Sequence, residues 1–311
     1  MADGAGQIIT LPKLPDIQCY HTHSERFDMK LDDPGWSLVD QKLGPGVELP
    51  KVLRKIAAMR DWSADKWPPS GDSPWDYLTQ ATYNFGDIRN AAYAVVPHIV
   101  EFAGQNRRPA EQVNAMLFVL DIVLGPLEGV AAIPWKLVEE FEQSLLKMGV
   151  MAEAILRSGQ LAEGARKIAV AAGVLGSREL VAARLAYGLA LENLVLPCPT
   201  CGSDIEFQFT RDRWIAQSGV ETELIRFAGE AHRASDFAKF AELASTATLG
   251  DEYDHIGELE ATVECPACSA RSEILALAEA DVAKRCPLAR VEGWRPENYQ
   301  IPTQTTPPRR R

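Results

Sequence analysis

Cys198-Pro-Thr-Cys201 and Cys265-Pro-Ala-Cys268 are two matching pairs of cysteines, and they decide how the last third of this chain folds. Each pair separates its two thiols by two residues, a spacing that lets one tight turn direct both sulfur atoms at a single ion. Two such turns complete a tetrahedral four-thiolate site that leaves no coordination position open for a substrate. The sequence therefore predicts that these four cysteines bind one structural Zn²⁺.

The segments that flank the two pairs also match each other. A strand-like stretch runs into the first cysteine of each pair, and alternating residues leave the second, as in Ile205–Phe209 and Ser272–Leu277. This pattern resembles a zinc ribbon, in which two short β-hairpins hold one ion. The alternatives are two separate redox motifs or unconnected buried cysteines. Redox pairs normally begin a helix in a thioredoxin-like unit, and neither pair does so.

The stretch between the two pairs is far longer than the ~15–20 residues of a compact ribbon. Because loop-closure entropy grows only with the logarithm of loop length, the longer insertion costs about 1 kcal/mol more. We expect an ordered helical insertion over 211–259, with a helix at 235–244. Ser235 is its predicted N-cap, and Phe237, Phe240 and Ala241 lie on its apolar side, together with Leu243 or Ala244.

Composition limits the classes of protein to which the chain can belong. Its 311 residues are 46% hydrophobic and 24% charged, which is ordinary for a globular protein with a sizeable core. No apolar run approaches the ~20 residues of a membrane span, and the N-terminus lacks the pattern of a signal peptide. Cysteines in metal-type pairs favour a reducing cytoplasm. The net charge of −11 counts against nucleic-acid binding, which depends on Lys and Arg neutralising phosphates.

Residues 46–194 read as a succession of helices with short breaks. Pro50 is placed to start one helix, with Val52, Leu53, Ile56 and Met59 on one stripe. Ser73-Pro-Trp75 begins another, and 87–103 is a helix that is kinked or restarted at Pro97. Further helices are predicted at 109–124, 134–157, 161–173 and 177–194, the last with Ser177 as its N-cap.

An aliphatic-Pro dipeptide followed by an apolar stripe recurs at Leu49-Pro50, Val96-Pro97 and Ile133-Pro134. The intervals suit a two-helix solenoid unit of HEAT or armadillo size. A helical domain without repeats is the alternative.

The block Trp75-Asp-Tyr-Leu-Thr-Gln-Ala-Thr-Tyr-Asn-Phe-Gly86, followed by 87–103, resembles bacterial HEAT-repeat proteins. The resemblance covers 49–104 well and 109–194 loosely, and the Cys-Pro-Thr-Cys-Gly202 knuckle matches by motif only. It implies a helical array and a surface for binding a protein, as in immunity or interaction proteins, and it implies no reaction. Family members often have His-Gln-Gly where this chain has Tyr83-Asn-Phe-Gly86. Only the glycine carries over, so a ligand role for that turn is not implied.

Other candidate residues carry weaker signals. Cys19, His21 and His23 would lie on one side of an extended strand, which is a possible metal face of an enzyme, but no fourth ligand follows at motif spacing. Glu252 and His255 have the spacing of a di-iron ligand pair, without the second copy that such a site needs. We therefore expect 251–260 to be a solvated acidic face. His98 is predicted to be a hydrogen-bonded, partly buried histidine, and Cys286 a buried thiol.

The aromatic residues near the first helix pair are predicted to anchor the core and its loops, or, if exposed together, to bind a protein partner. They are Trp62, Trp67, Trp75 and Tyr77. The only basic cluster visible in the sequence is Pro307-Pro-Arg-Arg-Arg311, which we interpret as part of a disordered tail.

The overall prediction is an all-α protein with a small β zinc ribbon. Its parts are an irregular segment (1–45), a HEAT-like α-solenoid (46–194), a split zinc ribbon (195–290, with strands from 195–209 and 260–277) and a tail (291–311). The favoured function is a cytoplasmic, non-enzymatic interaction module with a structural Zn²⁺ that binds a basic protein partner, because opposite potentials speed association. The alternatives are a nucleic-acid-associated zinc ribbon and a metal-dependent enzyme that uses Cys19, His21 and His23. Neither a membrane nor a nucleic acid is the expected partner.

Overall fold

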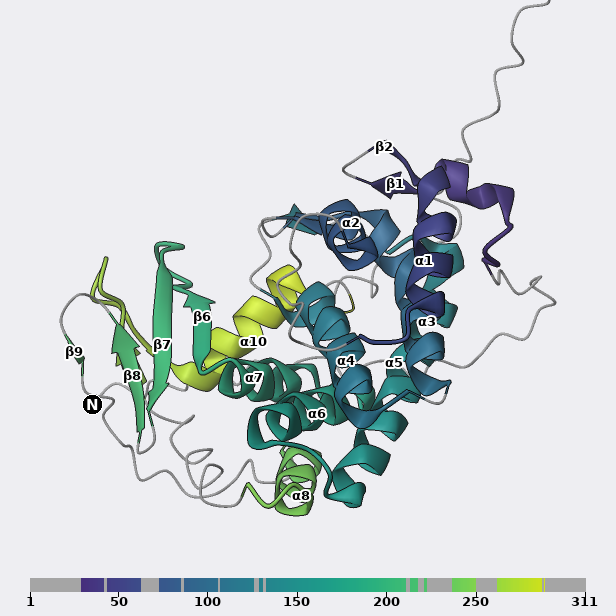
Figure 1. Cartoon of the computed structure of the whole chain (residues 1–311). Helices are drawn as coiled ribbons and strands as arrows, with labels where there is room; N and C mark the ends of the chain where they lie inside the picture. The colour runs from purple at the N-terminus through teal and green to yellow at the C-terminus, as the bar shows by residue number, and fades with distance from the viewer. Residues whose placement is uncertain are drawn as a thin grey trace, which may run out of the picture.

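The structure of the chain is a computed structural model in which helices predominate and a small β region lies at one side (Figure 1). It describes residues 29–41, 44–62, 73–84, 87–105, 107–125, 129–130, 133–210, 213–217, 221–222, 237–249, 262–286 and 288. Several predictions fall outside these residues: those for Cys19, His21, His23, Trp67, Ser235, the segment 251–260 and the tail 291–311. Within the described part of the chain, no helix is both long and apolar enough to cross a membrane.

The described chain begins with short elements that pack onto the first helices. They are η1 (Pro34–Leu38), β1 (Asp40–Gln41), β2 (Gly44–Pro45) and η2 (Gly46–Glu48). Trp36 is 2% exposed, and its indole Nε1 donates a hydrogen bond to the carbonyl of Lys30 at 2.9 Å. Helix α1 (Leu49–Ala58) buries Val52, Leu53 and Ile56, as the apolar stripe predicted.

The next helix begins at the cap that the sequence predicted, whereas the helix after it begins at Asn90 and not at 87, because Asp87–Ile88 forms a strand. Helix α2 (Pro74–Thr82) has Ser73 as N-cap, and Ser73 and Asp76 form a reciprocal capping box. Helix α3 (Asn90–Gly104) runs through the buried Pro97 as one element, so the helix does not restart there. A small sheet of β3 (Tyr83–Asn84), β4 (Asp87–Ile88) and β5 (Gly129–Val130) lies beside these helices.

The central helices are α4 (Pro109–Leu124), α5 (Trp135–Ser158), α6 (Glu163–Gly176) and α7 (Leu180–Ala190). Helix α4 begins and ends where the sequence predicted. Helices α5 and α6 cross very closely, since a Cβ built on Gly149 would lie 2.9 Å from the Cα of Gly176. The prediction that Ser177 caps α7 is wrong. Its hydroxyl instead donates to the carbonyl of Val174 at 2.7 Å, and Ser177 closes the end of α6.

The C-terminal third contains more regular structure than the sequence predicted. An antiparallel sheet has the order β6 (Asn193–Pro197), β7 (Asp204–Thr210), β8 (Arg213–Gln217), β9 (Glu221–Thr222). Its core pairs are Leu194 opposite Phe207 and Leu196 opposite Ile205, and all four side chains are buried. The predicted helix at 177–194 is therefore too long, because Leu194 lies in a strand.

The insertion is not wholly helical, because β8 and β9 occupy its beginning and only α8 (Ala238–Thr246) is a helix among its described residues. Phe240, Leu243 and Ala244 are buried as predicted, whereas Ala241 is exposed. The last hairpin joins β10 (Thr262–Glu264) to β11 (Arg271–Glu273).

The predicted strand at 272–277 is wrong beyond residue 273, because Ile274 begins helix α10 (Ile274–Arg285). The buried positions of α10 recur at helical spacing, with Ile274, Leu277, Ala278, Asp281 and Val282 on the buried side. Helix α10 packs against α7 and β6, so it links the β region to the helices.

Candidate metal centre

Two backbone turns of the same design hold the four cysteines. In the first turn, the amide of Cys198 donates to the carbonyl of Ser203 and the amide of Gly202 donates to the carbonyl of Cys198, both at 2.8 Å. Gly202 has φ +77°, the left-handed region that glycine adopts without steric cost. The turn is thereby closed directly after the second cysteine, between the paired strands β6 and β7.

The second turn repeats these hydrogen bonds with different residues. The amide of Cys265 donates to the carbonyl of Ala270, and the amide of Ser269 donates to the carbonyl of Cys265, again both at 2.8 Å. Ser269 takes the place of the glycine and has φ +58°, a conformation that costs a residue with a Cβ about 1 kcal/mol or more. The chain keeps this conformation because the turn needs it, which indicates that the geometry of the knuckle matters in both copies.

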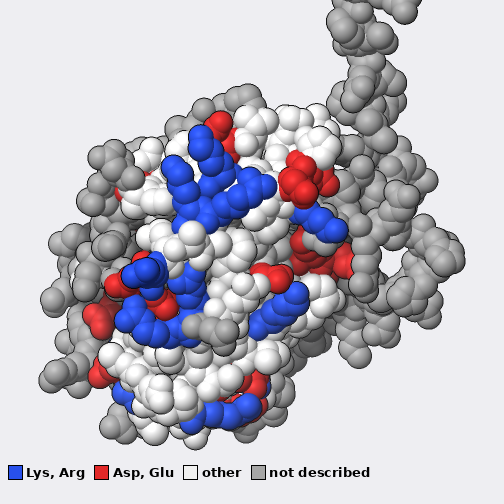
Figure 2. All heavy atoms as spheres, turned by 45° about the vertical axis from the view of Figure 1, so that its right-hand side comes forward, with Lys and Arg blue, Asp and Glu red and all other residues white. Residues whose placement is uncertain are grey.

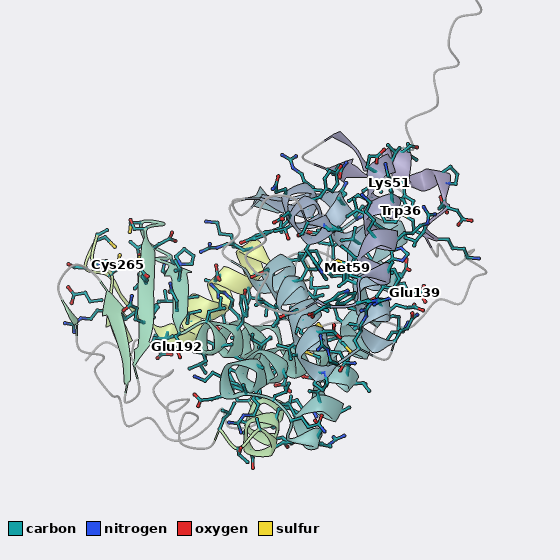
Figure 3. All side chains as sticks on the ribbon, in the orientation of Figure 1. Trp36, Lys51, Met59, Glu139, Glu192 and Cys265 are labelled. Atoms are coloured by element: carbon teal, nitrogen blue, oxygen red, sulfur yellow. The ribbon has the colours of Figure 1, made fainter. Side chains whose placement is uncertain are left out.

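The two turns face each other and bring their sulfur atoms together. The Sγ atoms of Cys198 and Cys268 lie 3.7 Å apart, and so do those of Cys201 and Cys265. All four Sγ atoms lie within 4.8 Å of one another. Figure 3 labels Cys265, which lies in the β region at the side of the molecule opposite α1. The four predicted site residues are thus one cluster that is compatible with a metal ion, although the two pairs are far apart in the sequence.

The cluster has a buried side and an exposed side. Cys198 and Cys265, which come first in each pair, are 2% and 1% exposed, whereas Cys201 and Cys268 are exposed to solvent. An ion at the centre would therefore be anchored against the protein core and shielded from water by sulfur.

The surroundings shift the pKa values of the exposed cysteines Cys201 and Cys268 in opposite directions. Hydrogen bonds from the side chain and backbone of Ser203 lower the pKa of Cys201 to about 6. The backbone hydrogen bond at Ala270 lowers the pKa of Cys268, but burial and the other three thiols outweigh it and raise that pKa overall. A divalent cation needs thiolates, so its binding here would displace protons and weaken at acid pH.

A buried ion pair fixes the first hairpin to the helices. The Nε of Arg184 on α7 donates to Oδ2 of Asp281 on α10 at 2.9 Å, and both side chains are at most 5% exposed. The guanidinium of Arg184 also donates to the carbonyl of Val195 in β6 at 2.7 Å. Arg285 lies 2.5 Å from the other oxygen of Asp281. One carboxylate and one guanidinium therefore join α7, β6 and α10.

This ion pair was missed at the level of sequence, although a signal exists. Arg184 stands among apolar residues of α7, and Asp281 stands on the apolar side of α10. A single charge at a core position predicts a buried partner of opposite sign. The partner could not be identified, because the two residues are far apart in the sequence.

The remaining candidates lie away from the cysteines. His98 is half-buried, and its Nε2 lies 2.9 Å from the carbonyl of Met29, as expected for a hydrogen-bonded histidine. Cys286 is 3% exposed, which confirms its prediction as a buried thiol. Trp62 and Trp75 are core residues whose rings meet edge to face at 5.3 Å, so they do not form an exposed partner site.

A comparison of the chain with models of protein families, with curated protein sequences and with solved structures finds no significant match. The function is therefore argued from the site and the surface alone.

Proposed function

We propose that the chain is a non-enzymatic protein-interaction module in which a structural Zn²⁺ fixes the C-terminal hairpins against a helical array. The observation that carries this proposal is the convergence of four sulfur atoms from two equivalent turns. In a tetrahedral site with Zn–S bonds of ~2.3 Å, neighbouring sulfur atoms lie about 3.8 Å apart. The closest pairs here, at 3.7 Å, fit that geometry.

Four thiolates complete the coordination of Zn²⁺, so the ion would have no open position for a substrate or a water nucleophile. Purified protein is expected to contain one Zn²⁺ per chain by elemental analysis. The Cys201→Ser variant is expected to lose most of that zinc, and Cys286→Ser is expected to retain it. Zinc that is absent from the wild type, or retained by Cys201→Ser, would refute the assignment.

We also propose that the helices form a HEAT-type array. The packing of alternate helices supports this: α3 contacts α4 and α5, while α6 contacts α4 and α5. Such contacts are expected where two-helix units stack on one another. In this reading, α10 and the zinc-bound hairpins cover the last helix, α7, whose apolar face would otherwise meet solvent.

The proposed partner is a basic protein that inserts a Lys or Arg side chain into a cavity of about 400 Å³ between α7 and α10. The cavity is lined by Glu179, Leu180, Val181, Ala182, Phe237, Leu275 and Glu279. Its charged residues are two half-buried glutamates, and its other walls are apolar. This combination suits a long cationic side chain, whose methylene groups pack on apolar walls while the charge meets carboxylates.

The net charge of −11 supports the choice of a basic partner through long-range attraction. The hairpin at 193–210 contains no Lys or Arg, and the described residues of the second hairpin contain only Arg271. This composition favours a protein over a nucleic acid as the partner of these two hairpins.

The test is affinity capture from a native lysate with the wild type and with the double variant Glu179→Gln, Glu279→Gln. The wild type is expected to retain a basic protein in stoichiometric amount, and the double variant is expected to lose it. A matched control, Glu139→Gln with Glu163→Gln, removes the same charge from α5 and α6 and should retain the partner. Failure of the wild type to retain any stoichiometric protein would refute the interaction function. Equal retention by the pocket variant would refute the cavity as its site.

A further inference from the structure

Helix α1 carries a basic row on the solvent side of an acidic protein. Lys51, Arg54 and Ala57 are spaced three apart, so they lie along one face of the helix. Arg60 follows just beyond the end of α1, and Lys51, Arg54 and Arg60 are all exposed. Figure 2, which brings the α1 side of the molecule forward, shows Lys and Arg gathered in clusters on that face.

This row ends at a cavity of about 410 Å³ that is lined by three arginines and a single carboxylate. The lining residues are Ala57, Arg60, Phe102, Gln105, Arg107, Arg108 and Glu111. The cavity lies where the end of α1 meets the turn between α3 and α4, on the opposite side of the molecule from the cysteine cluster (Figures 1 and 3). Its volume is in the range of small-molecule sites.

Arg107 is fixed at this cavity by contacts that, among the described residues, include no carboxylate. Its guanidinium donates to the carbonyls of Met59 at 2.6 Å and Ala57 at 2.7 Å, and it stacks over the ring of Trp62 at 4.4 Å. Carbonyls and an aromatic face orient a guanidinium but do not cancel its charge. The cation is therefore preorganised, with N–H groups to spare beyond the two that donate to α1.

The other two arginines differ in how they are compensated. Arg108 contacts Asp61 at 2.8 Å and Glu111 at 3.2 Å, so its charge is largely balanced. Among the described residues, Arg60 and Arg107 have no ion-pair partner, and both line the cavity. The cavity therefore retains positive charge although the chain as a whole is acidic.

We propose that this cavity binds a small phosphate-bearing ligand of nucleotide size. Guanidinium groups pair with phosphate oxygens through two parallel hydrogen bonds, a geometry that a spherical anion such as chloride cannot match. Arg107 and Arg60 supply the phosphate contacts, and the half-buried ring of Phe102 supplies an apolar wall for the remainder of the ligand. Lys51 is paired with Glu48 at 3.3 Å, so the attraction of an anion toward the cavity comes mainly from Arg54 and Arg60. This site is independent of the cysteine cluster and of the proposed protein partner.

The test is isothermal titration calorimetry of the zinc-loaded full chain with inorganic phosphate, pyrophosphate, ADP and a single-stranded oligonucleotide. Pyrophosphate and ADP are expected to bind more tightly than phosphate, because two phosphoryl groups engage both arginines. Arg60→Gln should weaken ADP binding about tenfold, the effect of losing one charge-assisted hydrogen bond. Arg60 is exposed and has no hydrogen bond or ion pair from its side chain within the described part of the chain, so this variant should keep the melting temperature of the wild type. The control Lys147→Gln removes one exposed charge from α5 and should bind ADP like the wild type.

Three results would overturn the proposal. The first is the absence of binding heat with pyrophosphate and ADP at millimolar concentration. The second is equal ADP affinity in Arg60→Gln and the wild type. The third is binding of the oligonucleotide alone, which would assign the basic surface to a nucleic acid and not to a small ligand.

Discussion

Removing one partner of the ion pair between Arg184 and Asp281 should strongly destabilise the C-terminal half. Both side chains are at most 5% exposed, so neither charge is solvated once its partner is lost. Asp281→Asn keeps the shape of the side chain but leaves the guanidinium of Arg184 buried and uncompensated. Breaking a buried pair from one side costs about 3–5 kcal/mol. We expect the free energy of unfolding to fall by that amount, which is a large share of the roughly 5–15 kcal/mol of a typical domain.

The assay is urea unfolding followed by circular dichroism, with zinc content measured on the folded protein. The matched control is Asp204→Asn, whose carboxylate is exposed and lies 3.8 Å from Arg285, and its loss should cost less than about 1 kcal/mol. The double variant Arg184→Met, Asp281→Leu removes both charges and should be more stable than Asp281→Asn alone. A loss below about 1 kcal/mol in Asp281→Asn, or equal losses in the single and double variants, would refute the reasoning.

Three further predictions concern other parts of the chain. Burial raises the pKa of Asp121 to about 6, although the hydrogen bond from Tyr187 opposes this shift. The protonated Asp121 side chain therefore contributes its full stabilisation below pH ~4, and this contribution is lost as the pH rises through 6. Asp121→Asn should remove this dependence, which is worth about 3 kcal/mol between pH 4 and pH 7.5, and a pH-independent difference between the two proteins in urea unfolding would contradict it. Gly149→Ala would force a Cβ to within 2.9 Å of Gly176 and should cost about 1–3 kcal/mol in urea unfolding, whereas Gly164→Ala, which meets open space, should not destabilise. Removal of metal with a chelator should loosen the C-terminal region before the helices, measured by hydrogen exchange, and identical exchange with and without metal would argue against a structural ion.

Much of the helical region could be predicted from the sequence, because its signals are local. The apolar stripe of α1, the capping box at Ser73 and the bounds of α4 depend on neighbours within one or two helical turns. The strand prediction at 272–277 failed because it also rested on a local signal, and here that signal was ambiguous. A short apolar run fits a strand or a buried helix equally well, and only packing against α7 and β6 decides for the helix.

The spacing within each cysteine pair, together with the residues around it, determined the four metal-binding candidates and the two equivalent turns. These features follow from the sequence because a knuckle closes its hydrogen bonds within six residues. The sequence also predicted that the two turns share one ion, and the structure brings their four sulfur atoms together. Tertiary structure alone decided that Arg184 pairs with Asp281 and that Arg60 shares a cavity with Arg107. Each of these contacts joins residues that are distant along the chain. Such contacts form only where the packing of whole helices brings two side chains together. The residues around one side chain do not identify the residue that it will contact.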